Sequence, residues 1–189
     1  MQDIFLIIST VIGLITPIIG IRAVLRGEYK PHRITRLVLL IVTVLFVATL
    51  VAQNDRTALY LALAQVIGSI GIFILSIKYG VGGTSKMDAV VFLGAMASLV
   101  IWKTTNNPAL GLYASILTDL IGFSPTIVKA WKDHKSEDWK FYACDVLASF
   151  FNLLALRSLL LNEIVFPIYI FLINLIITSI LLYKKSRHD

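Results

Sequence analysis

The sequence predicts an all-α integral membrane protein in which seven transmembrane helices form two parallel three-helix bundles joined by a linker helix. Of its 189 residues, 58% are hydrophobic and 15% are charged, and the mean hydropathy is +0.85. Soluble domains are about 45–50% apolar and about 25% charged. The apolar residues form runs close to the length of a membrane span. No long stretch alternates polar and apolar residues, so we expect helices, which satisfy their own backbone hydrogen bonds in lipid.

The expected spans are seven apolar runs separated by polar residues, at about 4–25, 35–52, 58–77, 88–102, 108–128, 141–161 and 164–183. The fourth run is shorter than the roughly 17 residues that a span needs. The first run is too long for a cleavable signal and lacks a basic flank, so we expect it to remain as a helix. Pro108 is expected to begin the fifth helix, and Pro167 to lie in the first turn of the seventh.

Basic residues predict the orientation. All but three of the 17 lysines and arginines fall at one set of helix ends, and the three exceptions are Arg56, Lys103 and Arg157. Because basic residues mark cytoplasmic ends, we expect the N-terminus outside and the C-terminus in the cytoplasm. The basic loops fit anionic lipid headgroups rather than nucleic acid. The short loops favour a bacterial or archaeal plasma membrane.

An internal repeat divides the chain. Pro17 and Pro125 each lie late in the first helix of a triplet and precede a basic loop. We therefore expect a first three-helix bundle at 1–80, a linker helix at 81–106 and a second bundle with a short tail at 107–189. Repeats of three helices plus one linker share their orientation in the membrane. Each proline removes a backbone hydrogen bond, so both are candidate hinges.

The second repeat carries a family resemblance. Residues 119–126, Asp-Leu-Ile-Gly-Phe-Ser-Pro-Thr, followed by the basic stretch 129–137, resemble a PQ-loop repeat. The 3+1+3 plan is similar to that of SWEET transporters and cystinosin-type carriers. The resemblance implies transport, with Asn152 and Asn174 matching asparagines that line a central sugar site. The glutamine of the Pro-Gln pair is replaced by Ile18 and Thr126, and no tryptophan lies at mid-membrane depth, so the solute class stays open.

Polar residues within the apolar runs are the candidate site. We expect four of them to bind the solute, namely Asn174, Asn152, Gln65 and Ser69. Asp119 and Asp145 are candidates for proton coupling. A carboxylate at bilayer depth costs about 2.5–3.5 kcal/mol on insertion scales, so such groups usually face an interior cavity. Either acid could instead brace two helices or pair with Arg157.

These features favour a transporter of a small polar solute, such as a sugar or an amino acid, that works by alternating access and is open to proton coupling. The alternatives are a membrane receptor similar to the KDEL receptors and a vitamin-precursor facilitator, for which Phe46, Phe150 and Phe151 could supply stacking. No Ser-His-Asp set shares one depth, and the histidines lie in loops or the tail, so neither an enzyme nor a metal site is expected. No cofactor is expected. The expected partners are the solute and the bilayer, and a homo-oligomer is compatible with the sequence.

Overall fold

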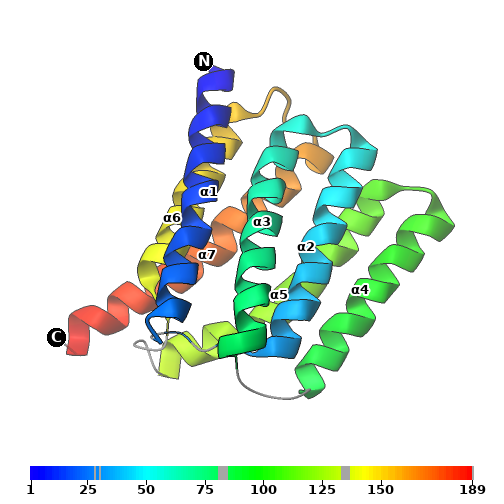
Figure 1. Cartoon of the computed structure of the whole chain (residues 1–189). Coiled ribbons are helices and arrows are strands. Elements are labelled where there is room, and N and C mark those ends of the chain that lie inside the picture. The colour runs from blue at the N-terminus through cyan, green and yellow to red at the C-terminus, as the bar shows by residue number, and fades with distance from the viewer. Residues whose placement is uncertain (28, 30, 81–84, 133–136, 189) are drawn as a thin grey trace.

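A computed structural model of the chain describes residues 1–27, 29, 31–80, 85–132 and 137–188. The described residues form seven helices and no strand (Figure 1). In chain order they are α1 (Gln2–Leu25), α2 (Arg33–Gln53), α3 (Arg56–Tyr79), α4 (Lys86–Thr105), α5 (Pro108–Lys132), α6 (Trp139–Ala155) and α7 (Leu161–His188). Six of these helices, all except α6, are long and apolar enough to cross a membrane. The predicted all-α architecture of apolar, membrane-length helices is therefore confirmed.

Helix α4 is longer than the sequence predicts. It contains 20 residues, because the side chains of Ser85 and Asp88 form a capping box that begins the helix before the apolar run starts. At the other end, Asn106 takes a left-handed conformation with a φ of 53°, which ends the helix. Local capping therefore gives α4 the length of a full membrane span.

Helix α6 is shorter than the sequence predicts. It ends at Ala155 rather than near residue 161, because Leu156 takes an extended conformation with a ψ of 135°. The following turn is tied to the start of α1, where the Gln2 side chain donates to the Leu156 carbonyl at 2.9 Å. Helix α7 then begins at Leu161, so Pro167 lies inside this helix and not in its first turn as predicted.

The helices run alternately up and down the molecule (Figure 1). Helices α1, α3, α5 and α7 finish at the end where α2, α4 and α6 begin, and we call this end the basic end. It carries every described lysine and arginine except Arg56, Lys103 and Arg157. Lys30 and Lys135, which belong to the same predicted set, lie outside the described residues. The clustering of basic residues used to predict orientation is thus present in the structure.

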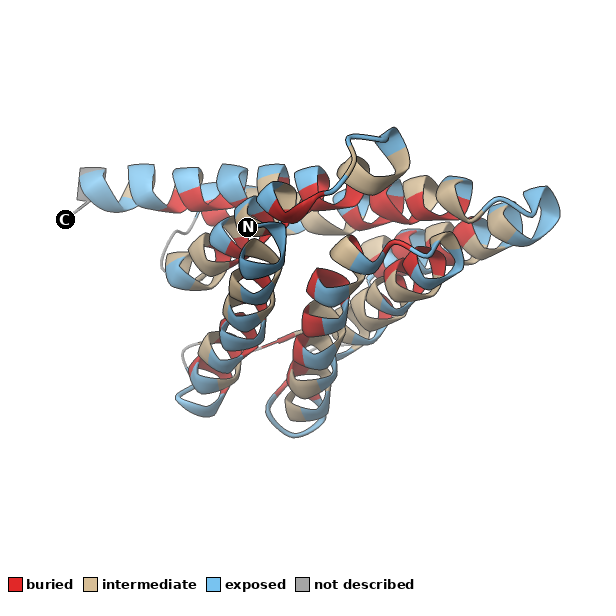
Figure 2. Cartoon of the chain, turned by 90° about the horizontal axis from the view of Figure 1, so that it is seen from above, coloured by how far each residue is buried: buried red, intermediate tan, exposed pale blue. Residues whose placement is uncertain are grey.

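The packing of the helices follows one scheme in each half of the chain. Helix α3 lies between α1 and α2, and α7 lies between α5 and α6. Across the two halves, α1 packs against α6, and α2 packs against α5. Helix α4 lies at the edge of the molecule against α5 and α2 (Figures 1 and 2). Six helices therefore surround the centre, and α4 stands outside them.

Apolar side chains cover the outside of the molecule as well as its core. The buried core contains the edge-to-face pair Phe46 and Phe166, with ring centroids 5.1 Å apart. Large exposed apolar residues occur on the outward faces of the helices, including Ile7 of α1, Ile67 of α3 and Leu93 of α4. Exposed helix faces show clearly in the view from above (Figure 2). An apolar exterior of this extent suits contact with lipid rather than water.

Candidate functional site

A cavity of about 110 Å³ lies among the six inner helices. Residues from α1, α2, α3, α5, α6 and α7 line it, and none from α4. Its polar lining consists of Thr16, Arg36, Thr43, Gln65, Ser69, Asp119, Thr126, Tyr142, Asp145 and Asn174. The structure thus gathers polar side chains that are widely separated in the sequence around one space inside an apolar protein.

Most of the residues that the sequence singles out line this cavity. Gln65 and Ser69 reach it from α3, and Asn174 reaches it from α7. Gln65 and Ser69 lie one turn apart, and neither makes a hydrogen bond to another described residue through its side chain. Unsatisfied polar groups on the wall of a cavity are suited to water or a polar solute.

The two candidate acids also line the cavity, each beside a hydroxyl group of another helix. The Tyr169 hydroxyl of α7 donates to the Asp119 carboxyl group of α5 at 2.7 Å. Thr16 of α1 places its hydroxyl beside the Asp145 carboxyl group of α6. Both acids are buried, at 4% and 9% exposure. Neither has a described lysine or arginine within salt-bridge distance, so each is a buried carboxyl group between two helices.

Arg157 is not the partner of either acid. It lies after α6 and pairs with Asp3 at 2.6 Å, and both side chains are largely exposed. This pair joins the α6–α7 turn to the start of α1 at the end opposite the basic end.

Asn152 lies outside the cavity. It is fully buried, and its side-chain amide donates to the Thr57 carbonyl at 2.9 Å, which joins α6 to α3. Its own carbonyl oxygen has no hydrogen-bond partner among the described residues. Asp145 and Asn152 lie seven residues apart on α6 and both are buried, but only Asp145 lines the cavity.

The two candidate hinge prolines lie in different surroundings. Pro17 of α1 lines the cavity and contacts Gly68 of α3 so closely that a Cβ atom on this glycine would lie 2.7 Å from the proline Cβ. Pro125 lies in α5 on a surface depression that also includes Met87 of α4. Both prolines are inside their helices, where each leaves one backbone carbonyl without its helical donor.

Arg36 is one of the cavity residues that the sequence does not single out. It belongs to the basic residues near helix ends that predict the orientation, yet it lines the cavity together with Leu39, Thr43 and Phe46 of the same helix face. Its guanidinium group donates to the Tyr29 hydroxyl and lies over the Tyr29 ring, 5.2 Å from the centroid. Arg36 and Thr43 are seven residues apart, a spacing that returns to nearly the same helix face. This spacing is the feature of the sequence that could have placed Arg36 beside Thr43 in the interior.

The cavity lies toward the basic end. Its lining begins at mid-helix in α1, α3 and α5 and continues toward the ends of those helices, while α2 and α6 contribute residues near their starts. On the opposite side Phe46 lines the space and packs edge-to-face against Phe166. An aromatic pair therefore lies between the polar lining and the end that carries the N-terminus.

Polar side chains from both halves of the chain meet at the basic end. Glu137 contacts the Lys129 ammonium at 3.1 Å and accepts a hydrogen bond from the Tyr142 hydroxyl at 2.8 Å. The Lys129 ammonium also lies 5.9 Å from the centroid of the Tyr29 ring. Since Tyr29 contacts Arg36, the chain of contacts runs from the α1–α2 connection to α5 and α6.

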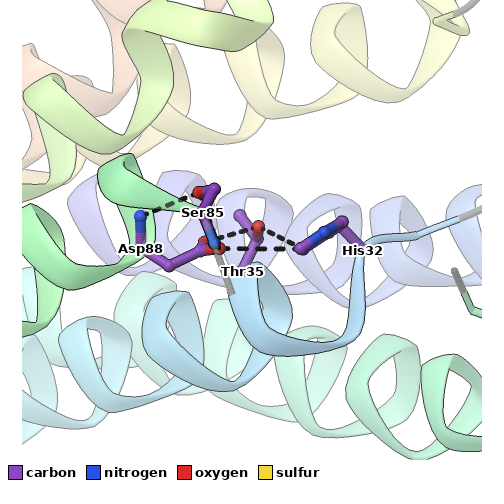
Figure 3. Close-up of polar contacts among 4 residues, drawn as sticks. All are labelled: His32, Thr35, Ser85 and Asp88. Atoms are coloured by element: carbon purple, nitrogen blue, oxygen red, sulfur yellow. Dashed lines mark hydrogen bonds and ion pairs between the residues drawn. The ribbon is translucent and has the colours of Figure 1, made fainter. Parts of the chain in front are cut away.

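A second polar cluster holds α4 against α2 at the basic end (Figure 3). The Thr35 hydroxyl donates to Asp88 at 2.6 Å and lies 2.9 Å from Nδ1 of His32, which is 3.8 Å from Asp88. Ser85 donates to the same carboxylate from its hydroxyl at 2.7 Å. None of these residues lines the cavity. The cluster anchors the edge helix. Residues 81–84 of the glycine-rich segment before it lie outside the described residues.

No family model, no curated protein and no solved structure matches this chain. In the described part of the chain, no three His, Cys, Asp or Glu residues come together in a group that could hold a metal ion. The chemistry of the cavity consists of two carboxyl groups, two carboxamides, hydroxyl groups and one guanidinium group. Such a set can bind a small polar molecule and can exchange protons, both inside an apolar protein.

Proposed function

We propose that this chain is a membrane transporter that carries a small polar solute by alternating access. The observation that carries the proposal is the central cavity, which six helices from both halves of the chain line with polar side chains. Polar and ionisable groups buried at membrane depth are costly and mark solute or ion pathways. Gln65, Ser69 and Asn174 are the proposed solute ligands. Asn152 is then proposed to support the site indirectly, because its hydrogen bond to the Thr57 carbonyl joins α6 to α3.

The proposed architecture is two parallel three-helix bundles, at 1–80 and 107–189, joined by a linker at 81–106. The matching neighbour order of α1, α2, α3 and of α5, α6, α7 supports it, as does the position of α4 outside the cavity. The crossed pairing of α1 with α6 and of α2 with α5 is what a two-fold relation between the halves would produce. All seven helices are proposed to span the membrane, and the resemblance to PQ-loop and SWEET-like carriers agrees with this arrangement.

The basic end is proposed to face the cytoplasm, which places the N-terminus outside. In that orientation the cavity lies toward the cytoplasm, and the packed pair Phe46 and Phe166 is proposed to close its outer side. Transport then requires this pair to separate while the helices close around the cavity at the basic end. Pro17 and Pro125 are the proposed hinges of this movement.

A receptor on the same scaffold is supported by one observation, the presence of Arg36 in the cavity. A peptide end would need a larger space, because about 110 Å³ is less than the roughly 150 Å³ cavity that accommodates one benzene molecule. For a vitamin-precursor facilitator, only Phe46 of the three candidate phenylalanines lines the cavity. Phe150 and Phe151 contact one another, at 5.7 Å between ring centroids. A small solute fits the cavity better than either alternative ligand.

The test is uptake into proteoliposomes by a variant whose cavity is filled. A thermal-shift screen of sugars, amino acids and nucleosides first identifies a solute that stabilises the purified protein. Ser69→Trp places an indole ring in the cavity, so we expect uptake of that solute to fall to the level of empty liposomes. Leu93→Trp is the control, because Leu93 lies on the exposed face of α4 and is 66% exposed. Equal uptake by the two variants would contradict the proposal.

A further inference from the structure

Arg36 is a cation on the cavity wall, and no carboxylate in the described part of the chain forms a salt bridge with it. Among the described residues Arg36 forms no salt bridge; its guanidinium group donates to the Tyr29 hydroxyl and lies within electrostatic range of Glu137 and Tyr142. The nearby acid Glu137 is already held by Lys129 and by the Tyr142 hydroxyl. A partly buried cation that forms no direct ion pair is unfavourable, and an anion bound against it in the cavity would relieve that cost.

The geometry of the guanidinium group favours one kind of anion. Its five N–H donors lie in a plane and match the two oxygens of a carboxylate in a bidentate pair. One hydroxyl contact, with Tyr29, leaves further N–H groups for a ligand. Arg36 also lines the same space as the unpartnered side chains of Gln65 and Ser69, which could bind the remainder of the solute.

Size and charge narrow the ligand further. The cavity volume of about 110 Å³ is smaller than the roughly 150 Å³ of a cavity that binds one benzene molecule. The solute should therefore be somewhat smaller than benzene. Asp119 and Asp145 line the same space and, when ionised, repel negative charge, so a dianion such as phosphate is disfavoured. A single negative charge beside one guanidinium group fits this balance best.

We propose that the cavity binds a small monocarboxylate, and that Arg36 holds its carboxylate group. This inference rests on the proposed function in that the cavity is taken as the solute site. The carboxylate has two possible sources. A simple hydroxy acid would place its hydroxyl among Gln65, Ser69 and Asn174. An α-amino acid would place its ammonium group toward Asp119 or Asp145.

The experiment measures binding to the full-length protein in detergent by isothermal titration calorimetry. The probes are L-lactate, L-alanine, L-lactamide and glycerol, which have the same number of non-hydrogen atoms, and inorganic phosphate. We expect lactate or alanine to bind at least about tenfold more tightly than lactamide and glycerol, since only the first two carry a carboxylate. The tighter of the two identifies the source. Binding of lactamide, glycerol or phosphate as tight as that of both carboxylates would overturn the inference.

Two variants test the role of Arg36. Arg36→Gln should weaken carboxylate binding at least about tenfold, and Arg36→Lys should restore part of it. Arg26→Gln is the matched control, because Arg26 is an exposed basic residue at the end of α1 and does not line the cavity. Unchanged carboxylate affinity in folded Arg36→Gln would overturn the inference. If that variant does not fold, the preference of the wild type for carboxylate over amide remains a sufficient test.

Flux separates this inference from the proposed function. Uptake of glycerol without any carboxylate binding would overturn the inference and leave the transporter proposal standing. Binding of lactate or alanine that depends on Arg36, without uptake of either into proteoliposomes, would support the inference and contradict transport.

Discussion

At the scale of single residues, Asp119 carries the proposal of proton coupling. Its carboxyl group is buried at mid-helix in α5, lines the cavity and accepts a hydrogen bond from Tyr169 of α7. Gaining or losing a proton changes what this group can donate and accept, and so changes the contact between two helices. Asp145 has a comparable position beside Thr16, which makes it the second candidate.

Asp119→Asn tests this role. Asparagine has nearly the same shape and can still accept the Tyr169 hydrogen bond, but it cannot release a proton. We expect pH-gradient-driven uptake of the solute identified by thermal shift to be at least about tenfold lower in Asp119→Asn than in the wild type, while the variant stays folded. Asp3→Asn is the control, because Asp3 is exposed and pairs with Arg157. Undiminished pH-driven uptake by Asp119→Asn would rule out proton coupling at this residue.

The sequence predicts that Asp119 and Asp145 belong to the site. It does not predict that Arg36 lines the cavity or that Asn152 bonds to the Thr57 carbonyl. An acid in an apolar run is conspicuous because nothing but a cavity or a polar partner explains it. A basic residue near a helix end has an ordinary explanation in topology, and this obscured Arg36. The partner of Asn152 is a backbone carbonyl at Thr57, and no pattern along the chain reveals which helix an amide will face.

At the scale of helices, the cap of α3 makes stability depend on pH. Asp55 lies in the α2–α3 connection, where one carboxylate oxygen accepts a hydrogen bond from the Ala58 N–H at 3.0 Å. The other oxygen is buried without a hydrogen-bond partner among the described residues. Burial raises the pKa of Asp55 above its usual value of 3.8, and the backbone hydrogen bond opposes this only in part.

Asp55→Asn tests the cap. Because the folded pKa is raised, Asp55 contributes its stability below the unfolded pKa and loses it as pH rises through the folded pKa. We expect thermal unfolding in detergent to show that the stability of the wild type falls as the pH rises from the unfolded to the folded pKa of Asp55. In Asp55→Asn this fall should shrink, because asparagine caps a helix equally well and carries no charge. Asp138→Asn, at the cap of α6, is the control and should keep the wild-type pH dependence. The same fall in Asp55→Asn would contradict the assignment.

The close contact of α1 with α3 at Pro17 requires a glycine, which has no side chain, at position 68 of α3. A Cβ atom at Gly68 would lie 2.7 Å from the Pro17 ring, which cannot turn aside. We therefore expect Gly68→Ala to lower the free energy of unfolding by about 1–3 kcal/mol. Gly71→Ala is the control, since its Cβ would meet only the flexible end of Ile21, at 3.0 Å. Denaturation in detergent compares them, and equal stability of the two variants would refute this account of the contact.

Helix boundaries show where sequence reasoning succeeds at this scale. Seven runs of apolar residues predict seven helices because membrane-length apolar segments are hard to mistake. The ends of α4 and α6 depend instead on caps and on contacts with distant residues, such as that of Gln2 with the Leu156 carbonyl. Such contacts form only after the helices have packed, so the apolar run alone misplaces the ends.

At the scale of the whole molecule, two sets of three helices enclose one cavity that lies nearer the basic end. The Phe46–Phe166 pair lies on the side of the cavity toward the opposite end. A carrier must open the same cavity to each side in turn, whereas a receptor need expose it to one side only. Access to the cavity from the two sides of the membrane therefore distinguishes the two functions.

Labelling of a single cysteine in the cavity measures this access directly. Cys144 is the only native cysteine, so Cys144→Ser gives a background into which Ser69→Cys or, as a lipid-facing control, Leu93→Cys can be introduced. A membrane-impermeant thiol reagent is applied to sealed vesicles of each orientation. We expect Ser69→Cys to be labelled from both sides of the membrane, and Leu93→Cys from neither. Labelling of Ser69→Cys from one side only, with or without solute, would contradict alternating access.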